Sequence, residues 1–316
     1  MILVTGGAGF IGTHTVRALC DAGEECLLAQ RRSPVVPDSL TDLPVHVAQV
    51  DVTDLDALLT VGREHPVTGI VNLALALPWP STDVPPVDGV RTGVDGFLNV
   101  VQAAQEWGVR RVVSASTIGV YGDRLAQGGA LTEDLPLSLG RSHPIPTFKK
   151  TAELLGGFLS ATSEVDVVTA RVNGNWGPGG HQPDPFFAPP SLAYAAAHRV
   201  APDFSQMEVA PHAEDSLDFS YVKDTGRALA MLQLADELQH TTYNVASGFA
   251  TSNAEVVEAL RRIEPSFEAH LPDAEVPPRT WLDTERLRTD TGFEPEWDLE
   301  RSAADYVTWL RDGHER

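Results

Sequence analysis

The sequence predicts an α/β fold: a doubly wound parallel sheet with a smaller C-terminal substrate-binding domain. Two observations predict it. Apolar strand segments alternate with helical segments through the first half of the 316 residues, which is typical of a parallel sheet with helices on both faces. A glycine-rich turn also follows the first apolar segment directly, where dinucleotide-binding βαβ units hold phosphate.

The first strand is predicted at residues 2–4, and residues 5–12 read TGGAGFIG before a helical pattern begins. Gly7 allows the tight turn, Gly9 lets the backbone approach a pyrophosphate, and Gly12 lets helix and strand pack closely. The dipole and free N–H groups of the helix N-terminus attract the anion. The alternative is a plain strand-to-helix turn. The residues expected to hold the pyrophosphate are Gly6, Gly7, Gly9, Phe10, Ile11 and Gly12.

The second strand is predicted at residues 25–29 and is followed by Gln30, Arg31 and Arg32. A carboxylate at this point would bind the ribose 2′-hydroxyl of NAD, whereas arginine accommodates the 2′-phosphate of NADP. Arg31, helped by Arg32, therefore predicts NADP(H), with NAD also possible. Two solvated surface arginines would give the same sequence.

Further strands are predicted at 45–50, 70–75, 111–115 and 165–171, with helices at 55–61, 94–107 and 148–160. This alternation predicts a dinucleotide-binding (Rossmann) domain over residues 1–172 and 213–246. After residue 172 the sequence becomes rich in Gly and Pro. The substrate-binding domain is predicted over residues 173–212 and 247–316.

The formal net charge of −21 argues against binding to nucleic acid or anionic membranes, because the field of the protein would repel both. Cys20 and Cys26 fall on the first helix and second strand, as small reduced core residues would. No apolar run reaches membrane length and the first strand begins at residue 2, so a cytoplasmic location is expected. The ten histidines are scattered without ligand spacing, so no metal is expected.

Five separated motifs resemble the extended short-chain dehydrogenase/reductase family, in its NAD(P)-dependent epimerase/dehydratase branch. They are TGGAGFIG at 5–12, DVTD at 51–54, SASTIGVYG at 114–122, WGP at 176–178 and DFSYVKD at 218–224. The resemblance spans nearly the whole chain. It implies a nicotinamide dinucleotide cofactor, a small-molecule substrate, and oxidoreductase, epimerase or dehydratase chemistry.

The resemblance also implies roles for single residues. In this family the aspartate matching Asp51 touches the adenine, the hydroxyl matching Thr117 hydrogen-bonds the oxygen of the reacting carbon, and the lysine matching Lys149 bonds the nicotinamide ribose. Taken singly, Asp51 could equally be a turn residue and Thr117 an exposed strand-end hydroxyl. Three further residues are expected to bind the cofactor: Val52, Leu73 and Ala74.

The family's catalytic pair is a tyrosine four residues before a lysine, so that both side chains share one helical face. The lysine is present as Lys149, but Ile145 occupies the tyrosine position, and no tyrosine occurs between Tyr121 and Tyr194. The tyrosine would be the general acid/base, and losing such a group costs about 10²–10⁴-fold in rate. Hydride chemistry in this chain therefore requires another group or a water in its place.

Two residues are candidates for the missing proton carrier. Lys149 itself could serve, because a partly desolvated lysine titrates nearer neutrality. His143, two residues before Ile145, is the other, against the alternative of a solvated histidine in a loop before the helix. Tyr121 belongs to the family's Val-Tyr-Gly segment and is expected to be structural.

The substrate is less well defined by the sequence. Many nucleotide-sugar enzymes of this branch have an arginine before the Asp-Phe pair, where this chain has Leu217; that arginine would clamp a diphosphate. Between residues 172 and 221 the only fixed cation is Arg199. Arg279 could supply charge, unless it is a surface arginine. We expect a sugar-like or polyhydroxylated small molecule, and a nucleotide sugar is in doubt.

Three functions fit these observations. The first is an NADP(H)-dependent oxidoreductase, epimerase or dehydratase with a reassigned proton carrier. The second is a non-redox cyclase, lyase or isomerase that uses Thr117, His143 or Lys149, and the third is a catalytically silent nucleotide-binding regulatory protein. In relatives, the helices equivalent to 94–107 and 148–160 form a dimer interface, so a homodimer is expected unless these faces only cover the sheet.

Overall fold

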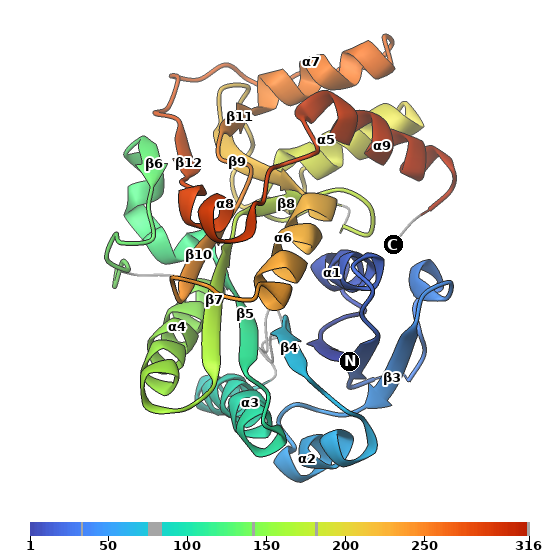
Figure 1. Ribbon diagram of the computed structural model, residues 1–316. Coiled ribbons are helices and arrows are strands. Elements are labelled where there is room, and N and C mark those ends of the chain that lie inside the picture. Colours follow the sequence, from blue (N-terminus) through green and yellow to red (C-terminus); the bar gives the residue numbers. More distant parts are fainter. Residues whose placement is uncertain (33, 75–83, 141–142, 181–182, 315–316) are drawn as a thin grey trace.

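The computed structural model describes residues 1–32, 34–74, 84–140, 143–180 and 183–314. A seven-stranded sheet occupies its lower half (Figure 1), in the order β10-β7-β5-β4-β1-β2-β3. Every pairing in it is parallel, so the predicted doubly wound sheet is confirmed. Its strands are β1 (Ile2–Thr5), β2 (Cys26–Gln30), β3 (Val45–Gln49), β4 (Gly69–Asn72), β5 (Arg111–Thr117), β7 (Asp166–Val172) and β10 (Thr242–Val245).

Helices cover both faces of this sheet. The helices on one face are α1 (Phe10–Asp21) and α6 (Val222–Leu234), and those on the other are α2 (Leu55–Glu64), α3 (Pro86–Trp107) and α4 (Pro144–Thr162). Alternation along the strands explains the two layers. Leu3 and Leu27 pack against the α2–α3 side, whereas Val4 and Leu28 pack toward α1 and α6. All four side chains are completely buried.

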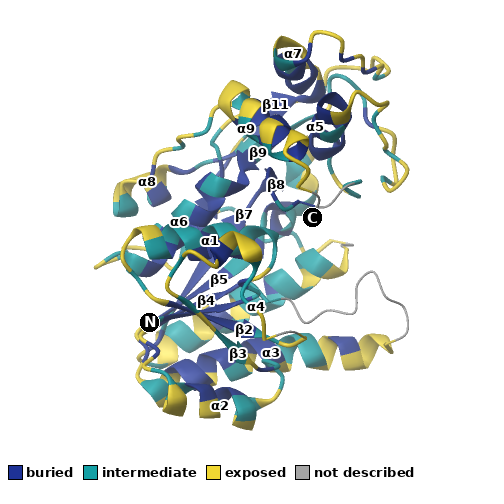
Figure 2. Ribbon diagram, turned by 90° about the vertical axis from the view of Figure 1, so that its right-hand side faces the viewer, coloured by how far each residue is buried: buried dark blue, intermediate teal, exposed yellow. Residues whose placement is uncertain are grey.

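A smaller unit lies at the carboxyl end of the sheet, in the upper part of Figure 2, and begins with β8 (Gly174–Trp176) directly after β7. β8, β9 (Ser216–Tyr221) and β11 (Ala250–Ser252) form a small sheet in the order β11-β9-β8, and β6 (Gly129–Leu131) pairs with β12 (Thr280–Leu282). An aromatic and alanine-rich core joins its three long helices. The remaining elements are η1 (Asp38–Leu40), η2 (Ile118–Ala126), α5 (Ala188–His198), α7 (Asn253–Ile263), α8 (Glu285–Thr291) and α9 (Leu299–Arg311).

The helix boundaries differ from the sequence prediction at their starts. The helix expected at 94–107 begins at Pro86, and the helix expected at 148–160 begins at Pro144. Proline suits the first helical position because its fixed φ is helical and its missing N–H has no partner there anyway. The strand expected at 70–75 ends at Asn72, and residue 75 lies outside the described residues.

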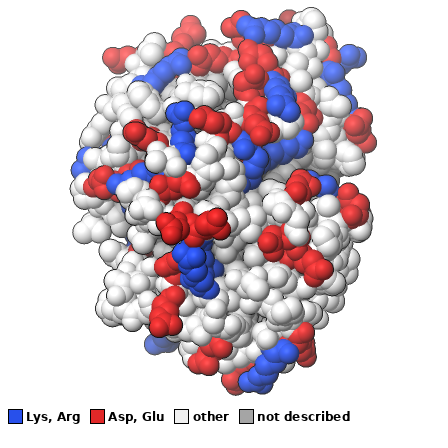
Figure 3. Space-filling view, in the orientation of Figure 1, with Lys and Arg blue, Asp and Glu red and all other residues white. Residues whose placement is uncertain are grey.

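The predicted domain division stays a prediction. Residues 213–246 contribute β10 to the large sheet, α6 to the helices that cover that sheet, and β9 to the small sheet. Among the described residues, no helix is both long and apolar enough to cross a membrane. Figure 3 shows acidic and basic side chains interspersed over the face seen in Figure 1, without one continuous basic patch.

Candidate active site

The turn after β1 depends on close contact between glycines. A Cβ atom on Gly12 would lie 2.2 Å from the carbonyl oxygen of Gly6, and one on Gly9 would lie 3.1 Å from the same atom. Gly6 itself has φ +68°, which favours glycine. Helix α1 therefore starts directly against the turn, and its first N–H groups have no acceptor within the helix. This arrangement fits a dinucleotide pyrophosphate.

Thr5 joins this turn to the loop after β4. Its hydroxyl donates to Asn72 Oδ1 at 2.6 Å and accepts the backbone N–H groups of Leu73 and Ala74 at 3.2 and 3.1 Å. A Cβ atom on Gly6 would lie 3.1 Å from the Ala74 nitrogen. The structure thus brings Leu73 and Ala74 beside the glycine turn, at the carboxyl edge where α/β proteins bind ligands.

Phe10 and Ile11 occupy the first turn of α1 with different surroundings. The Phe10 ring faces the smaller unit, because a Cβ atom on Gly180 would lie 3.3 Å from that ring. Ile11 packs against the core of β5, β7 and β10. Their side chains therefore fix the start of α1, and their backbone N–H groups are the parts expected to meet a phosphate.

The proposed adenosine end of the cofactor site is formed by the ends of β2 and β3. Arg31 Nη1 lies 3.8 Å from Asp51 Oδ2, and Arg31 is exposed. The other Asp51 oxygen accepts both the N–H and the hydroxyl of Thr53, at 3.0 and 2.9 Å. The Val52 carbonyl accepts the Asn99 side chain at 3.0 Å. Arg32, also exposed, follows in the chain, so the predicted residues lie close together here.

Strand β5 and helix α4 carry two of the three predicted catalytic residues, Thr117 and Lys149. Thr117 ends β5, and its hydroxyl accepts the N–H of Gly119 at 3.2 Å. Lys149 reaches from α4 to donate to the carbonyl of Ala115, two residues before Thr117. Burial lowers the pKa of Lys149 to about 8, against the opposing effect of the Glu153 charge. Ile145 lies one turn before Lys149 and is half-buried.

His143 is placed at the start of α4, outside the β5–Lys149 contact. Its exposed imidazole caps the helix, because Nδ1 accepts the N–H of Ile145 at 3.3 Å. The ring also meets Phe186 edge-on, with centroids 5.9 Å apart. A capping role therefore accounts for its position, and proton transfer by His143 stays a prediction.

A buried polar network behind Lys149 was not predicted from the sequence. Arg171 on β7 binds the Glu153 carboxylate, and Ser116 donates to the same carboxylate. Arg171 also donates to the Tyr121 hydroxyl at 3.0 Å and the Glu133 carbonyl at 3.2 Å. The sequence offered one sign of this network: Glu153 follows Lys149 by one helical turn, so both side chains lie on the same face of the helix.

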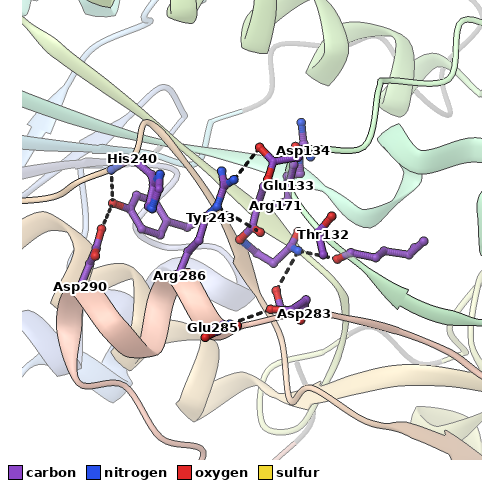
Figure 4. A network of polar contacts seen from close by, with 12 residues as sticks. Thr132, Glu133, Asp134, Arg171, His240, Tyr243, Asp283, Glu285, Arg286 and Asp290 are labelled. Atoms are coloured by element: carbon purple, nitrogen blue, oxygen red, sulfur yellow. Dashed lines mark hydrogen bonds and ion pairs between the residues drawn. The ribbon is translucent and has the colours of Figure 1, made fainter.

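This network continues to the C-terminal region (Figure 4). Arg286 on α8 binds Asp134 at 2.6 Å and lies 3.7 Å from Glu133. The Glu133 carboxylate accepts the N–H of Asn244, and the Asn244 side chain accepts the Tyr121 hydroxyl at 2.7 Å. Tyr121 is completely buried in these contacts, which makes it a structural residue of the network.

The two arginines considered for substrate binding each pair with a carboxylate. Arg199 binds Glu264 at 3.0 Å, and Arg279 binds Glu255 at 3.2 Å. Leu217 packs against the apolar cluster that includes Ile118 of η2. The described contacts therefore place an apolar side chain, rather than an arginine, on β9 beside η2.

A parallel sheet with a glycine-rich turn between its first strand and α1 is typical of a Rossmann-type dinucleotide-binding protein. The model of the NAD dependent epimerase/dehydratase family matches residues 2–246. This chain belongs to that family, as the resemblance predicted, and it is an enzyme of the epimerase/dehydratase class.

Known proteins match the chain over nearly its full length. The UDP-glucose 4-epimerase of Bacillus subtilis is 24% identical, over 98% of this chain and 96% of the relative. A structure of UDP-glucose 4-epimerase from Thermotoga maritima with UDP-glucose has a TM-score of 0.81 and 20% identity, and covers 99% of both chains. A structure of dTDP-glucose 4,6-dehydratase from Bacillus anthracis with NAD has a TM-score of 0.80 and 21% identity, covering 98% of this chain and 96% of that one. These two structural matches confirm the fold.

Proposed function

We propose that this protein is an NADP(H)-dependent oxidoreductase, epimerase or dehydratase that acts on a sugar-like or polyhydroxylated small molecule. Lys149, rather than a tyrosine, moves the proton. The observation that supports this best is the position of the Lys149 amine, at the carbonyl of Ala115 near the end of β5. Its lowered pKa of about 8 lets it both release and accept a proton near neutral pH.

The cofactor is held by three groups of residues in this proposal. The glycine turn from Gly6 to Gly12 binds the pyrophosphate, and Asp51 contacts the adenine. Arg31 and Arg32 bind the 2′-phosphate, which is supported by the proximity of Arg31 to Asp51. Bound there, a nicotinamide dinucleotide supplies hydride exchange. The dehydratase structure with NAD makes NAD the alternative cofactor.

The protein's own residues perform the proton transfer. Neutral Lys149 accepts the proton of a substrate alcohol, and its ammonium form returns a proton to a carbonyl oxygen. Thr117 donates a hydrogen bond to the same oxygen. Ile145 contributes no proton, and its half-buried side chain lies one helical turn before Lys149.

Titration of the purified protein with NADPH and NADH tests the cofactor assignment. Energy transfer from tryptophan to the reduced nicotinamide reports binding. We expect saturable binding that is tighter for NADPH. Tighter binding of NADH would contradict the 2′-phosphate assignment, and no binding of either would contradict the function.

A non-redox cyclase, lyase or isomerase is the second candidate, because Ile145 stands where the family's acid/base tyrosine would be. In that case the dinucleotide serves as a scaffold, and Thr117 and Lys149 act on the substrate. Product formation without any transient change at 340 nm, in a stopped-flow experiment, would favour this candidate.

We also infer a cytoplasmic homodimer. The apolar face predicted on α3 packs instead into the core, through Phe97, Val100, Val101 and Ala104. Helix α4, however, exposes Leu154 and Phe158, each 64% accessible. An exposed apolar face on α4 and the exposed Val87 and Val90 of α3 support pairing of two copies. Light scattering coupled to size-exclusion chromatography measures the mass of the assembly directly.

The cytoplasmic location is supported by the two cysteines, which are both free thiols, as expected in a reducing compartment.

A further inference from the structure

We propose that the substrate of this site carries an aromatic or other flat apolar group, which lies against Phe186 and Phe187, in place of a nucleoside diphosphate. This inference rests on the function proposed above and narrows its substrate class. Three observations support it: a row of rings that starts beside Ile145, an apolar wall around Gly174, and the pairing of the nearby cations.

The row of rings starts at His143, whose Nδ1 accepts the N–H of Ile145. Phe186 meets His143 edge-on at 5.9 Å, and Phe187 lies 6.0 Å from Phe186 between ring centroids. Phe187 in turn meets Phe219 on β9 edge-on at 5.6 Å. Aromatic side chains thus run without interruption from the first turn of α4 to the smaller unit.

The loop holds the first two phenylalanines in a defined arrangement. Asp184 Oδ1 accepts the backbone N–H groups of both Phe186 and Phe187, each at 2.8 Å. Phe186 nevertheless remains 46% accessible, although it is a large apolar side chain. A partly exposed aromatic ring beside α4 can contact a flat ligand by stacking or through its edge.

Gly174 marks the apolar wall behind this row. A Cβ atom at Gly174 would lie 3.0 Å from Phe219, 3.1 Å from Leu217 and 3.3 Å from Phe187. Three apolar side chains therefore converge on one backbone position of β8. Leu217 also continues this surface to η2, since it packs against the cluster containing Ile118. The surface runs from the end of β5 to β9.

The cationic side chains between residues 172 and 223 are already paired with carboxylates. Between residues 172 and 223 the sequence has two fixed cations, Arg199 and Lys223. Arg199 binds Glu264 at 3.0 Å, and Lys223 binds Asp305 at 2.7 Å. A diphosphate that displaced solvent here would need new positive partners, because a buried charge without one is strongly unfavourable. An uncharged ring meets no such penalty.

Calorimetry on the NADP⁺-saturated protein tests this inference with two glucosides that differ only in the aglycone. The probes are 4-nitrophenyl β-D-glucoside and methyl β-D-glucoside, and UDP is the third ligand. We expect the aryl glucoside to bind at least tenfold more tightly than the methyl glucoside, and UDP to bind more weakly than the aryl glucoside. Equal affinity of the two glucosides, binding of neither, or preferential binding of UDP overturns the inference.

Variants place the binding on the structure. Phe186→Ala is expected to weaken binding of the aryl glucoside about fivefold or more, because it removes a ring contact. The substitution leaves the buried core intact, since Phe186 is partly exposed. Val200→Ala, which truncates an apolar side chain of similar accessibility (50%) just beyond the C-terminal end of α5, is the matched control and leaves affinity unchanged. Equal losses in both variants, or no loss in Phe186→Ala, count against the assigned surface. NADPH titration of the same samples separates failure of the cofactor site from failure of this inference.

Discussion

Arg171 binds the Glu153 carboxylate at two points, with Nε 3.1 Å and Nη2 2.8 Å from Glu153 Oε2. Both side chains are almost completely buried, at 5% and 7% accessibility. Glu153 lies one helical turn after Lys149, and its charge raises the pKa of that lysine. Burial outweighs this charge, and the pKa of Lys149 falls to about 8. We therefore expect a change at this ion pair to alter the pKa of the proposed proton carrier.

Replacing Glu153 by Gln tests this relationship. The neutral amide removes the charge that favours the Lys149 ammonium, so the pKa of Lys149 and the midpoint of the pH–rate profile should both decrease. Loss of one partner from a buried ion pair should also lower the free energy of unfolding by about 3–5 kcal/mol. Glu153→Asp is the control, since it retains the charge. A purely structural role would lower stability and leave the pH midpoint unchanged.

Lys149 should determine the pH dependence of turnover. Alcohol oxidation needs the neutral amine, so its rate should rise with pH, about tenfold per unit, and level off above about 8. Carbonyl reduction needs the ammonium form, so its rate should fall above the same pH. Lys149→Arg stays protonated and cannot accept a proton, so oxidation should slow by about 10²–10⁴-fold. Steady-state rates from pH 6 to 10 measure both effects. An oxidation rate independent of pH across this range would exclude Lys149 as the base.

Arg31 should determine the choice between NADPH and NADH. Its guanidinium lies at the end of β2, beside Asp51, and is exposed to a ligand. Arg31→Ala should weaken NADPH about tenfold or more, since hydrogen bonds between charged groups contribute about 1.5–3 kcal/mol. NADH, without the 2′-phosphate, should change little. Fluorescence titration of Arg31→Ala against the exposed control Arg63→Ala measures the difference, and equal losses for both dinucleotides would exclude the assignment.

How far the sequence predicts the site depends on the range of the interaction. The glycine turn, β2 with Arg31 and the Lys149 helix were predictable, because each is a local pattern with a fixed period. The Arg171–Glu153 pair was not, since it joins β7 to α4 by tertiary packing. The start of α3 at Pro86 was also missed, because its first turns contain Gly89 and Gly93, which weaken a helical pattern. The ring contact between His143 and Phe186 joins segments that are distant in sequence.

Asp218 should be required for the stability of the smaller unit. Its carboxylate is fully buried and accepts hydrogen bonds from Asn173, the Ser247 hydroxyl and three backbone N–H groups. Burial nevertheless raises the pKa of Asp218 to about 6. In Asp218→Asn the amide N–H₂ would face two backbone donors, so the free energy of unfolding at pH 7 should decrease by about 2–4 kcal/mol. Urea denaturation against the exposed control Asp215→Asn measures this. Equal stability of the two variants would contradict it.

Ile145→Tyr asks whether the pocket still accepts the chemistry of the family. The new phenol would stand one helical turn before Lys149, whose positive charge would lower the phenol pKa. Around Ile145, Pro146 contacts η2 near Thr117, so the ring must fit between α4 and the end of β5. If the only missing part is a general acid/base, the variant should gain about 10²-fold or more in dinucleotide-dependent turnover of the aryl glucoside or a carbonyl panel.

Ile145→Phe is the control, because it adds a ring of similar size without the hydroxyl. Activity equal in Tyr and Phe variants would mean that Lys149 already supplies the proton transfer, or that the pocket no longer places a substrate alcohol beside residue 145. Lys149→Arg in the Ile145→Tyr background separates these outcomes: if the phenol has taken over the proton, oxidation keeps most of its rate without a titratable lysine, whereas continued dependence on Lys149 assigns the proton to the lysine alone.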